Sequence, residues 1–186
     1  MAGLPAGFRY EPEFLSADEE RDVLALVEAM TFEPVVLRGR AAKRTVAQFG
    51  YEYDYTGWGI RPTRPLPANL LWLRDRVGEL AGLPPGQSAA LAETLVIRYP
   101  PGAAMGWHRD TAAFGPTVIG VSLASAARLR FQRTVGEQRE VHEQALAPGS
   151  AYVLGGASRW QWQHAVPPAK ALRYSITFRT IAQPSA

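Results

Sequence analysis

Two stretches in the first half of the chain carry apolar residues at the three- and four-residue spacing of an amphipathic helix. The first follows Ser16, whose hydroxyl can cap a helix, and Glu19 lies three residues on as a capping-box partner. Its apolar face continues to about Met30. The second follows Pro67 and is expected to end at Gly82, because glycine favours the conformation that closes a helix. The apolar positions of the two helices are Val23, Leu24, Leu26 and Val27, and Leu70, Leu71, Leu73, Val77 and Leu80.

From Glu93 onward the pattern changes to short apolar or alternating runs that are separated by glycine and proline. Such runs are typical of strands in an antiparallel barrel or sandwich. Because helices come first and strands afterwards, we expect an α+β fold in which the N-terminal helices pack on a sheet. The expected strands cover residues 94–99, 117–123, 128–133, 151–154 and 173–179.

Composition limits the class of protein. Of the 186 residues, 47% are hydrophobic and 20% are charged, as expected for a single domain over residues 1–186. The chain contains no cysteine, which excludes disulfides, thiolate metal sites, iron–sulfur clusters and a cysteine nucleophile. It carries neither a signal-peptide pattern nor an apolar run of the roughly 18 residues that span a bilayer. We therefore expect a soluble, cytoplasmic monomer with no membrane contact.

A candidate metal site begins in the segment Trp107–Asp110, WHRD. Alternate side chains of an extended segment point the same way, so His108 and Asp110 can face one point. An imidazole and a carboxylate make up two thirds of the facial triad that holds non-haem Fe(II), and His164 is the best candidate for the third ligand. His142 lies in a polar stretch that is typical of a solvated strand or loop. A zinc site and a hydrogen-bonded structural role for His164 remain alternatives, because the same donor set also binds Zn²⁺.

Three tryptophans flank these candidate ligands. Trp107 precedes His108 and is a candidate for the wall of a pocket, or simply packs on its neighbours. Trp160 and Trp162 alternate with two glutamines before His164, which predicts that both tryptophans face the core and both glutamines point away.

The segment 173–179 places two arginines and two hydroxyls on one face of a strand. Arg173, Ser175, Thr177 and Arg179 share that face, whereas Tyr174, Ile176 and Phe178 are expected in the core on the other. Paired guanidinium groups are well suited to bind a dicarboxylate. The alternative is the exposed polar face of an edge strand.

A basic and aromatic stretch lies between the two expected helices. The net charge of +3 is small, so nucleic-acid binding depends on where the cations cluster. Basic side chains bind phosphates and aromatic rings stack on unpaired bases, so this stretch favours contact with a single-stranded or flipped nucleotide. The alternative is a surface hairpin whose aromatic residues pack on the core. The cations are Arg38, Arg40, Lys43 and Arg44, and the aromatic residues are Phe49, Tyr51, Tyr53, Tyr55 and Trp58.

Taken in order, these motifs resemble the AlkB family of Fe(II)- and 2-oxoglutarate-dependent dioxygenases. The resemblance covers about residues 93–181, and more loosely residues 44–55. It implies an α+β fold with a double-stranded β-helix (jelly-roll) core over about 93–181, N-terminal supporting helices, and a nucleotide-recognition lid over about 36–60. The motifs that carry it are Leu95–Gly102 (LVIRYPPG), His108-Arg-Asp110, Val121–Leu123 (VSL), Gly155–Arg159 (GGASR), His164 and Arg173–Arg179.

The resemblance also implies roles for individual residues. The three candidate ligands match the family's iron ligands, and Arg173 matches the arginine that pairs with the distal carboxylate of 2-oxoglutarate. Tyr99 matches a tyrosine that hydrogen-bonds the same cosubstrate, and Ser175 and Arg179 complete the pattern near it. Tyr51 and Tyr53 match the lid aromatics that sandwich the modified base. The remaining candidates on the substrate side are Arg44 and Trp107.

The implied activity is oxidative demethylation of N-alkylated bases in nucleic acid, with Fe(II), 2-oxoglutarate and O₂, as in alkylation repair. Three positions depart from the family pattern: Ile97 and Ser175 stand where asparagine is expected, and Ala112 stands where some repair members carry an acid. The first two concern cosubstrate binding and the third concerns substrate preference. The pattern leaves DNA, RNA and the type of lesion open. The alternative is an oxygenase of the same fold that acts on a protein side chain or a small metabolite.

Overall fold

The computed structural model describes residues 3–37, 39–54 and 59–182. The first helix, α1 (Ala17–Glu28), begins where the sequence predicts. The Ser16 hydroxyl accepts a hydrogen bond of 3.2 Å from the backbone N–H of Glu19, and the Glu19 carboxylate accepts one of 2.8 Å from the backbone N–H of Ser16. The predicted capping box is confirmed, and it satisfies two of the backbone donors that a helix leaves free at its start.

The second predicted helix is also present. A 3₁₀ turn, η1 (Ala68–Leu70), leads into α2 (Leu71–Ala81), and a second short turn, η2 (Ser88–Ala90), follows. Gly82 ends α2 with φ of 79°, a left-handed conformation that glycine adopts without the steric cost of a side chain. Its prediction as the end of the helix is confirmed.

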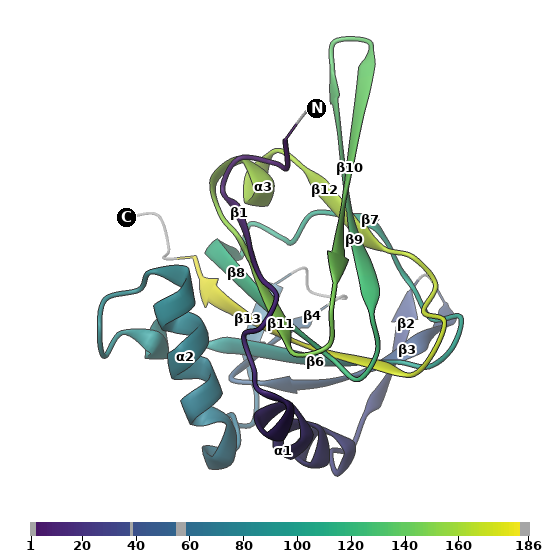
Figure 1. The fold of residues 1–186 in the computed structure, drawn as a ribbon. Helices are drawn as coiled ribbons and strands as arrows, with labels where there is room; N and C mark the ends of the chain where they lie inside the picture. The colour runs from purple at the N-terminus through teal and green to yellow at the C-terminus, as the bar shows by residue number, and fades with distance from the viewer. Residues whose placement is uncertain (1–2, 38, 55–58, 183–186) are drawn as a thin grey trace.

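A seven-stranded sheet forms the larger layer of the molecule, in the order β1-β11-β8-β13-β6-β3-β2 (Figure 1). Its strand pairs are antiparallel, and β13 occupies the centre. The edge-strand alternative for residues 173–179 is therefore wrong. The strands are β1 (Phe8–Glu11), β2 (Glu33–Leu37), β3 (Arg40–Phe49), β6 (Glu93–Tyr99), β8 (Phe114–Leu123), β11 (Ser150–Leu154) and β13 (Arg173–Ile181).

A four-stranded sheet in the order β10-β9-β12-β7 faces the larger one, and the hairpin β9–β10 extends well beyond the rest of the molecule (Figure 1). A separate two-stranded sheet joins β4 to β5. A short helix, α3, precedes β12. The bounds are β4 (Tyr51–Asp54), β5 (Gly59–Pro62), β7 (Met105–His108), β9 (Ala127–Val135), β10 (Gln138–Leu146), α3 (Gly156–Trp160) and β12 (Gln163–Val166).

Two apolar layers hold these elements together. In the first, α1 and α2 cover one face of the seven-stranded sheet, where Val23 and Val77 pack with Val121 and Ile176. In the second, the two sheets pack on each other through residues such as Phe131. The α+β jelly-roll fold with supporting N-terminal helices is confirmed. Among the described residues, no helix has the length and apolar character that crossing a membrane requires.

The region expected as a lid is divided between two structures. Strands β2 and β3 extend the large sheet, because β3 pairs with β6 from Thr45 to Phe49. Only β4 and β5 form a hairpin apart from it. Arg38, Tyr55 and Trp58 lie outside the described residues.

Candidate active site

The register of two neighbouring strands brings His108 and His164 together. The two residues are direct partners in the antiparallel pair β7–β12, and their ring centroids lie 4.2 Å apart. Asp110 follows two residues after the end of β7. One ligand atom from each of the three residues lies within 4.8 Å of the others. The structure therefore brings together the three residues that the sequence marks as candidate ligands.

Both imidazoles are placed to bind a metal ion. Burial, together with the neighbouring His108, lowers the pKa of His164 to about 3, so His164 is neutral near neutral pH. The Nδ1 atom of His108 lies 2.8 Å from the carbonyl oxygen of Gly106. A hydrogen bond donated there leaves Nε2 with its lone pair free, which is how a second group usually fixes a metal-binding histidine.

Asp110 supplies the negative charge. Burial by itself would raise its pKa, but Arg179 and the two histidines hold the pKa of Asp110 well below its usual range. Its Oδ1 accepts a hydrogen bond of 3.0 Å from Arg179, whereas its buried Oδ2 has no partner among the described residues. A buried carboxylate oxygen without a partner is costly unless a cation occupies the position beside it. This donor set of two imidazoles and one carboxylate fits non-haem Fe(II).

Arg179 holds a second carboxylate besides Asp110. Its Nη1 donates to both oxygens of Glu93, at 3.1 and 2.9 Å, and the two residues are direct partners across β13 and β6. Burial raises the pKa of Glu93 to about 7, against the opposing effect of Arg179. Arg179 therefore orients the free oxygen of Asp110 from a position fixed by the sheet.

A second buried arginine, Arg159, fixes the loop that carries Asp110. Only 3% of its surface is exposed, and its guanidinium donates four hydrogen bonds to backbone carbonyls in that loop. The distances are 3.1 Å to Asp110, 2.9 Å to Thr111, 3.0 Å to Phe114 and 3.2 Å to Gly115.

The candidate cosubstrate residues lie deeper between the sheets. Arg173 is 1% exposed and pairs with Tyr99 across β13 and β6, with its guanidinium 5.0 Å from the centre of the tyrosine ring. Its Nε donates 3.2 Å to the hydroxyl of Ser122, but its buried Nη1 has no partner among the described residues. An unpaired guanidinium nitrogen fits a carboxylate of a small ligand such as 2-oxoglutarate. Ser175 lies between Ile97 and Ser122 in the same sheet.

His108 and Asp110 line a cavity of about 400 Å³, whereas His164 is not among its described lining residues. Arg44, Tyr53 and Trp107 line it, whereas Tyr51 is not among the described residues that do so. Arg44 is buried and donates 3.3 Å to the carbonyl of Ala104, so it differs from the solvent-facing phosphate contact that the cluster of cations suggests. The apolar part of the lining consists of Val35, Val46, Leu95, Ile97, Met105 and Phe114.

The sequence assigned no role to three residues that support this site: Glu93, Ser122 and Arg159. Each acts through a partner that is more than 40 positions away in the chain, at Arg179, Arg173 and the loop after Asp110. Ser122 and Arg159 lie within the motifs that carry the family resemblance, which is the one pattern that marks them. Glu93 lies outside those motifs, and the sequence shows only that it is an acidic residue at the start of a buried strand.

Comparison with known proteins gives consistent matches. A family model described as the 2OG-Fe(II) oxygenase superfamily matches residues 8–179. The tRNA (carboxymethyluridine(34)-5-O)-methyltransferase ALKBH8 of Mus musculus is 31% identical over 173 residues, which are 91% of this chain and 26% of that protein. The mitochondrial alpha-ketoglutarate-dependent dioxygenase alkB homolog 7 of Bos taurus is 33% identical over 164 residues, covering 83% of this chain and 65% of that protein.

Among solved structures, OsALKBH1 has the same fold, with a TM-score of 0.72 at 16% identity over 97% of this chain and 99% of that one. The chain thus spans about a quarter of the length of the mouse relative and just under two thirds of the bovine one.

Proposed function

This chain belongs to the 2OG-Fe(II) oxygenase superfamily as an AlkB-like dioxygenase that uses Fe(II), 2-oxoglutarate and O₂, and we propose that it demethylates N-alkylated bases in nucleic acid. One observation carries the proposal: two of the three clustered candidate ligands, His108 and Asp110, line a cavity of about 400 Å³ together with Tyr53, Trp107 and Arg44. Small-molecule sites range over ~300–1,000 Å³, so the volume suits a single base. The name of the mouse relative describes a methyltransferase that acts on tRNA.

The proposal assigns the metal to His108, Asp110 and His164. Their two imidazoles and one carboxylate would hold Fe(II), with Arg179 orienting the carboxylate. The bound metal supplies the oxidation of the alkyl group at the expense of 2-oxoglutarate and O₂. The chain's own residues supply orientation, exclusion of water and placement of charge.

The cosubstrate is assigned to the residues around Arg173. Its unpaired Nη1 would donate to the distal carboxylate of 2-oxoglutarate, with Tyr99 and Ser175 beside it. Ser122 holds the guanidinium from the opposite side through Nε. Arg179, on the same strand, is retained as a candidate near the cosubstrate, and its bonds to Glu93 and Asp110 support a role beside the metal as well.

The substrate base would enter the cavity from the side of β3, β4 and β7. Tyr53 and Trp107 offer aromatic faces for stacking, which is worth about 1–3 kcal/mol per base in single-strand binding. Arg44 places a positive charge within the same cavity. Tyr51 is half-buried on the same strand as Tyr53 and is retained as a second lid residue.

The test is turnover of methylated DNA and RNA oligonucleotides, single- and double-stranded, with Fe(II), 2-oxoglutarate and ascorbate. Loss of one methyl group by mass, matched by succinate, is the expected result, and Asp110→Ala serves as the inactive control. Succinate formation stimulated by a peptide or metabolite but by no methylated oligonucleotide would instead establish the alternative oxygenase. We further propose that residues 1–186 form one domain that acts as a monomer in the cytoplasm. Sedimentation tests the oligomeric state, and cell fractionation tests the location.

A further inference from the structure

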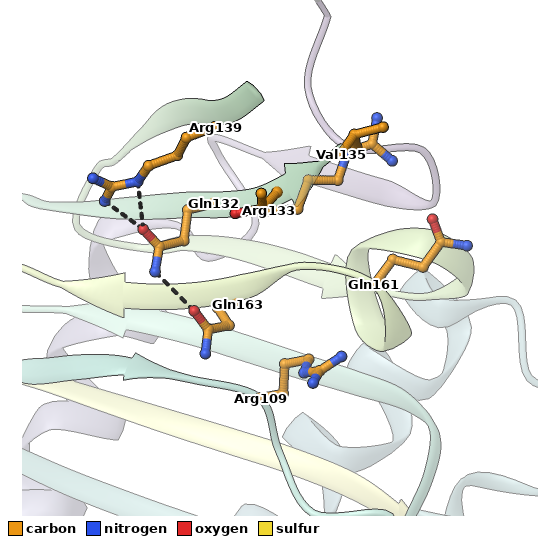
Figure 2. Close-up of a pocket in the computed structure, with 8 residues that line it drawn as sticks. Arg109, Gln132, Arg133, Val135, Arg139, Gln161 and Gln163 are labelled. Carbon is orange, nitrogen blue, oxygen red and sulfur yellow. Dashed lines mark hydrogen bonds between the residues drawn. The ribbon is translucent and has the colours of Figure 1, made fainter. Parts of the chain in front are cut away.

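The outer face of the four-stranded sheet, turned away from the core, carries a row of long polar side chains. Arg139, Gln132, Gln163 and Arg109 come from or follow β10, β9, β12 and β7 in turn (Figure 2). Gln132 and Gln163 are direct partners across β9 and β12. Their neighbours Phe131 and His164 face the core instead, because alternate residues of a strand point to opposite faces.

Hydrogen bonds along this row leave its positive charges without a counter-charge. Arg139 donates to the Gln132 side-chain oxygen, and Gln132 in turn donates 2.7 Å to the oxygen of Gln163 (Figure 2). Arg109 donates 3.2 Å to the backbone carbonyl of Trp160. Within the described part of the chain, neither Arg109 nor Arg139 has an ion pair with a carboxylate, so both charges are ordered by neutral oxygens and available to an anion.

These side chains line a groove of about 560 Å³. Its described lining contains three arginines and three glutamines and no acidic residue. The third arginine, Arg133, does have an ion pair, at 2.6 Å to Glu140. The lining residues are Arg109, Gln132, Arg133, Thr134, Val135, Arg139, Gln161 and Gln163.

The groove adjoins the active-site cavity, because the two share a lining residue. Arg109 lines both, and it stands between the candidate ligands His108 and Asp110 in the chain. Trp107 lines the cavity, and its ring centre lies 6.0 Å from the guanidinium of Arg139 in the groove. A ligand that occupies both spaces would have to be elongated and would pass Arg109.

We propose that this groove binds the phosphodiester backbone of the single strand whose modified base occupies the cavity, an inference that rests on the proposed function. Arginine forks match phosphate oxygens, and glutamine amides add neutral donors to phosphate and sugar. The groove is open and polar, which suits a chain that passes over it more than a small molecule enclosed by it. Contacts of this kind position a strand without reading its sequence.

Arg139 is the residue to test, because it is exposed and distant in sequence from the candidate ligands. Fluorescence anisotropy would compare oligothymidylate of about 20 nucleotides with a trinucleotide for wild type, Arg139→Gln and Arg139→Glu, over about 50–200 mM salt. Arg21→Gln is the matched control, since Arg21 is an exposed arginine on α1, on the other side of the large sheet. Thermal melting checks that each variant is folded.

We expect Arg139→Gln to weaken binding of the long strand about 2- to 5-fold and to reduce the slope of log affinity against log salt by roughly 0.7, the value for one phosphate contact on a single strand. Arg139→Glu should weaken it by about 10-fold or more, because it adds repulsion to the lost contact. Trinucleotide binding should change much less than binding of the long strand. Arg21→Gln should match the wild type with both ligands.

The outcomes separate this proposal from the proposed function. Turnover of methylated oligonucleotides, with wild-type affinity and salt slope in Arg139→Glu, would overturn the groove and leave the function standing. Loss of long-strand binding in Arg139→Glu, with no methylated base ever turned over, would support the groove and overturn the function. Polyglutamate that binds as tightly as the oligonucleotide, with equal dependence on Arg139, would show a general surface for acidic chains and overturn the groove as a nucleic-acid site.

Discussion

The guanidinium of Arg159 donates a hydrogen bond of 3.1 Å to the backbone carbonyl of Asp110, 49 positions earlier in the chain. The candidate metal ligand is thus held at both ends, by Arg159 at its backbone and by Arg179 at its side chain. Arg159 is not among the described residues that line the cavity or the groove, so it acts as a positioning residue.

Arg159→Lys should weaken metal binding, because a single ammonium cannot replace four hydrogen bonds from a planar fork. Loss of such outer partners typically costs ~10–100-fold in metal affinity. Arg159→Ala should also destabilise the fold, by about 2–4 kcal/mol, since it leaves buried carbonyls unpaired. Mn²⁺ titration and thermal melting measure the two effects. Unchanged Mn²⁺ affinity in a folded Arg159→Lys protein would contradict the positioning role.

Alanine at His108, Asp110 or His164 should abolish turnover of 2-oxoglutarate to succinate and weaken Mn²⁺ binding by more than the ~10–100-fold that an outer partner costs. The fold should persist, because open catalytic sites contribute less to folding than closed structural ones. His142→Ala is the matched control: that imidazole packs against Trp162 at 5.2 Å and is not part of the cluster. Normal succinate formation by His164→Ala would refute the triad.

Substitutions at Arg173 should change the requirement for 2-oxoglutarate. Arg173→Lys keeps the charge but loses the second donor, at a cost of about 1.5–3 kcal/mol, or roughly 10–100-fold in KM for 2-oxoglutarate. Ser122→Ala removes only the neutral hydrogen bond that orients the guanidinium of Arg173. It should therefore raise KM for 2-oxoglutarate about 2- to 10-fold. Succinate formation against 2-oxoglutarate concentration measures both. If Arg173→Lys and Arg173→Ala both saturate with 2-oxoglutarate as the wild type does, Arg173 has a structural role and does not bind the cosubstrate.

Glu93 should give the stability of the protein a distinct dependence on pH. Its folded pKa of about 7 lies above the ordinary value of 4.5, so the unfolded chain releases this proton first as the pH rises. The stabilisation from the protonated carboxyl is complete below the unfolded pKa and is lost as the pH rises through about 7. Wild type should therefore lose about 3 kcal/mol relative to Glu93→Gln over this window. The measurement is the melting temperature of both proteins across this pH window. A difference between them that does not change with pH would disprove the raised pKa of Glu93.

The two tyrosines of β4, Tyr51 and Tyr53, should differ in effect. Tyr53 lines the cavity, so Tyr53→Ala should remove about 1–3 kcal/mol of stacking on the target base without changing the salt dependence of binding. Tyr51→Ala should have a smaller effect, since its side chain is not part of the described lining. Affinity for a methylated trinucleotide across a salt series distinguishes them. A salt slope that falls in Tyr53→Ala would place this residue with the phosphate contacts instead.

Local patterns predict the parts of this structure that depend on neighbours in the chain. The cap at Ser16, the helix end at Gly82 and the shared face of Arg173 and Arg179 all follow from local geometry. Partners set by strand register lie beyond such patterns. No spacing rule connects Arg179 to Glu93, because their pairing depends on how β13 aligns with β6.

The alternation around Trp160 shows why a local pattern can fail. It predicts that Trp160 and Trp162 share a buried face, which is right for Trp162 and wrong for Trp160, whose surface is 43% exposed. The reason is that Trp160 ends α3, and the strand period begins only at β12. Gln161 and Gln163 both line the groove on the outer face, as the alternation predicts.

Because His108 and His164 are fixed by a register between β7 and β12, the length of chain between them is free to vary. The last rung that joins β9 to β12 is Gln132 with Gln163, and the hairpin beyond it has no partner in β12 (Figure 1). Insertions or deletions at its tip would leave the ligand positions untouched while altering the rim of the groove. Over evolutionary time, such a protein can acquire new targets by changing this hairpin alone, with its oxidative chemistry inherited intact.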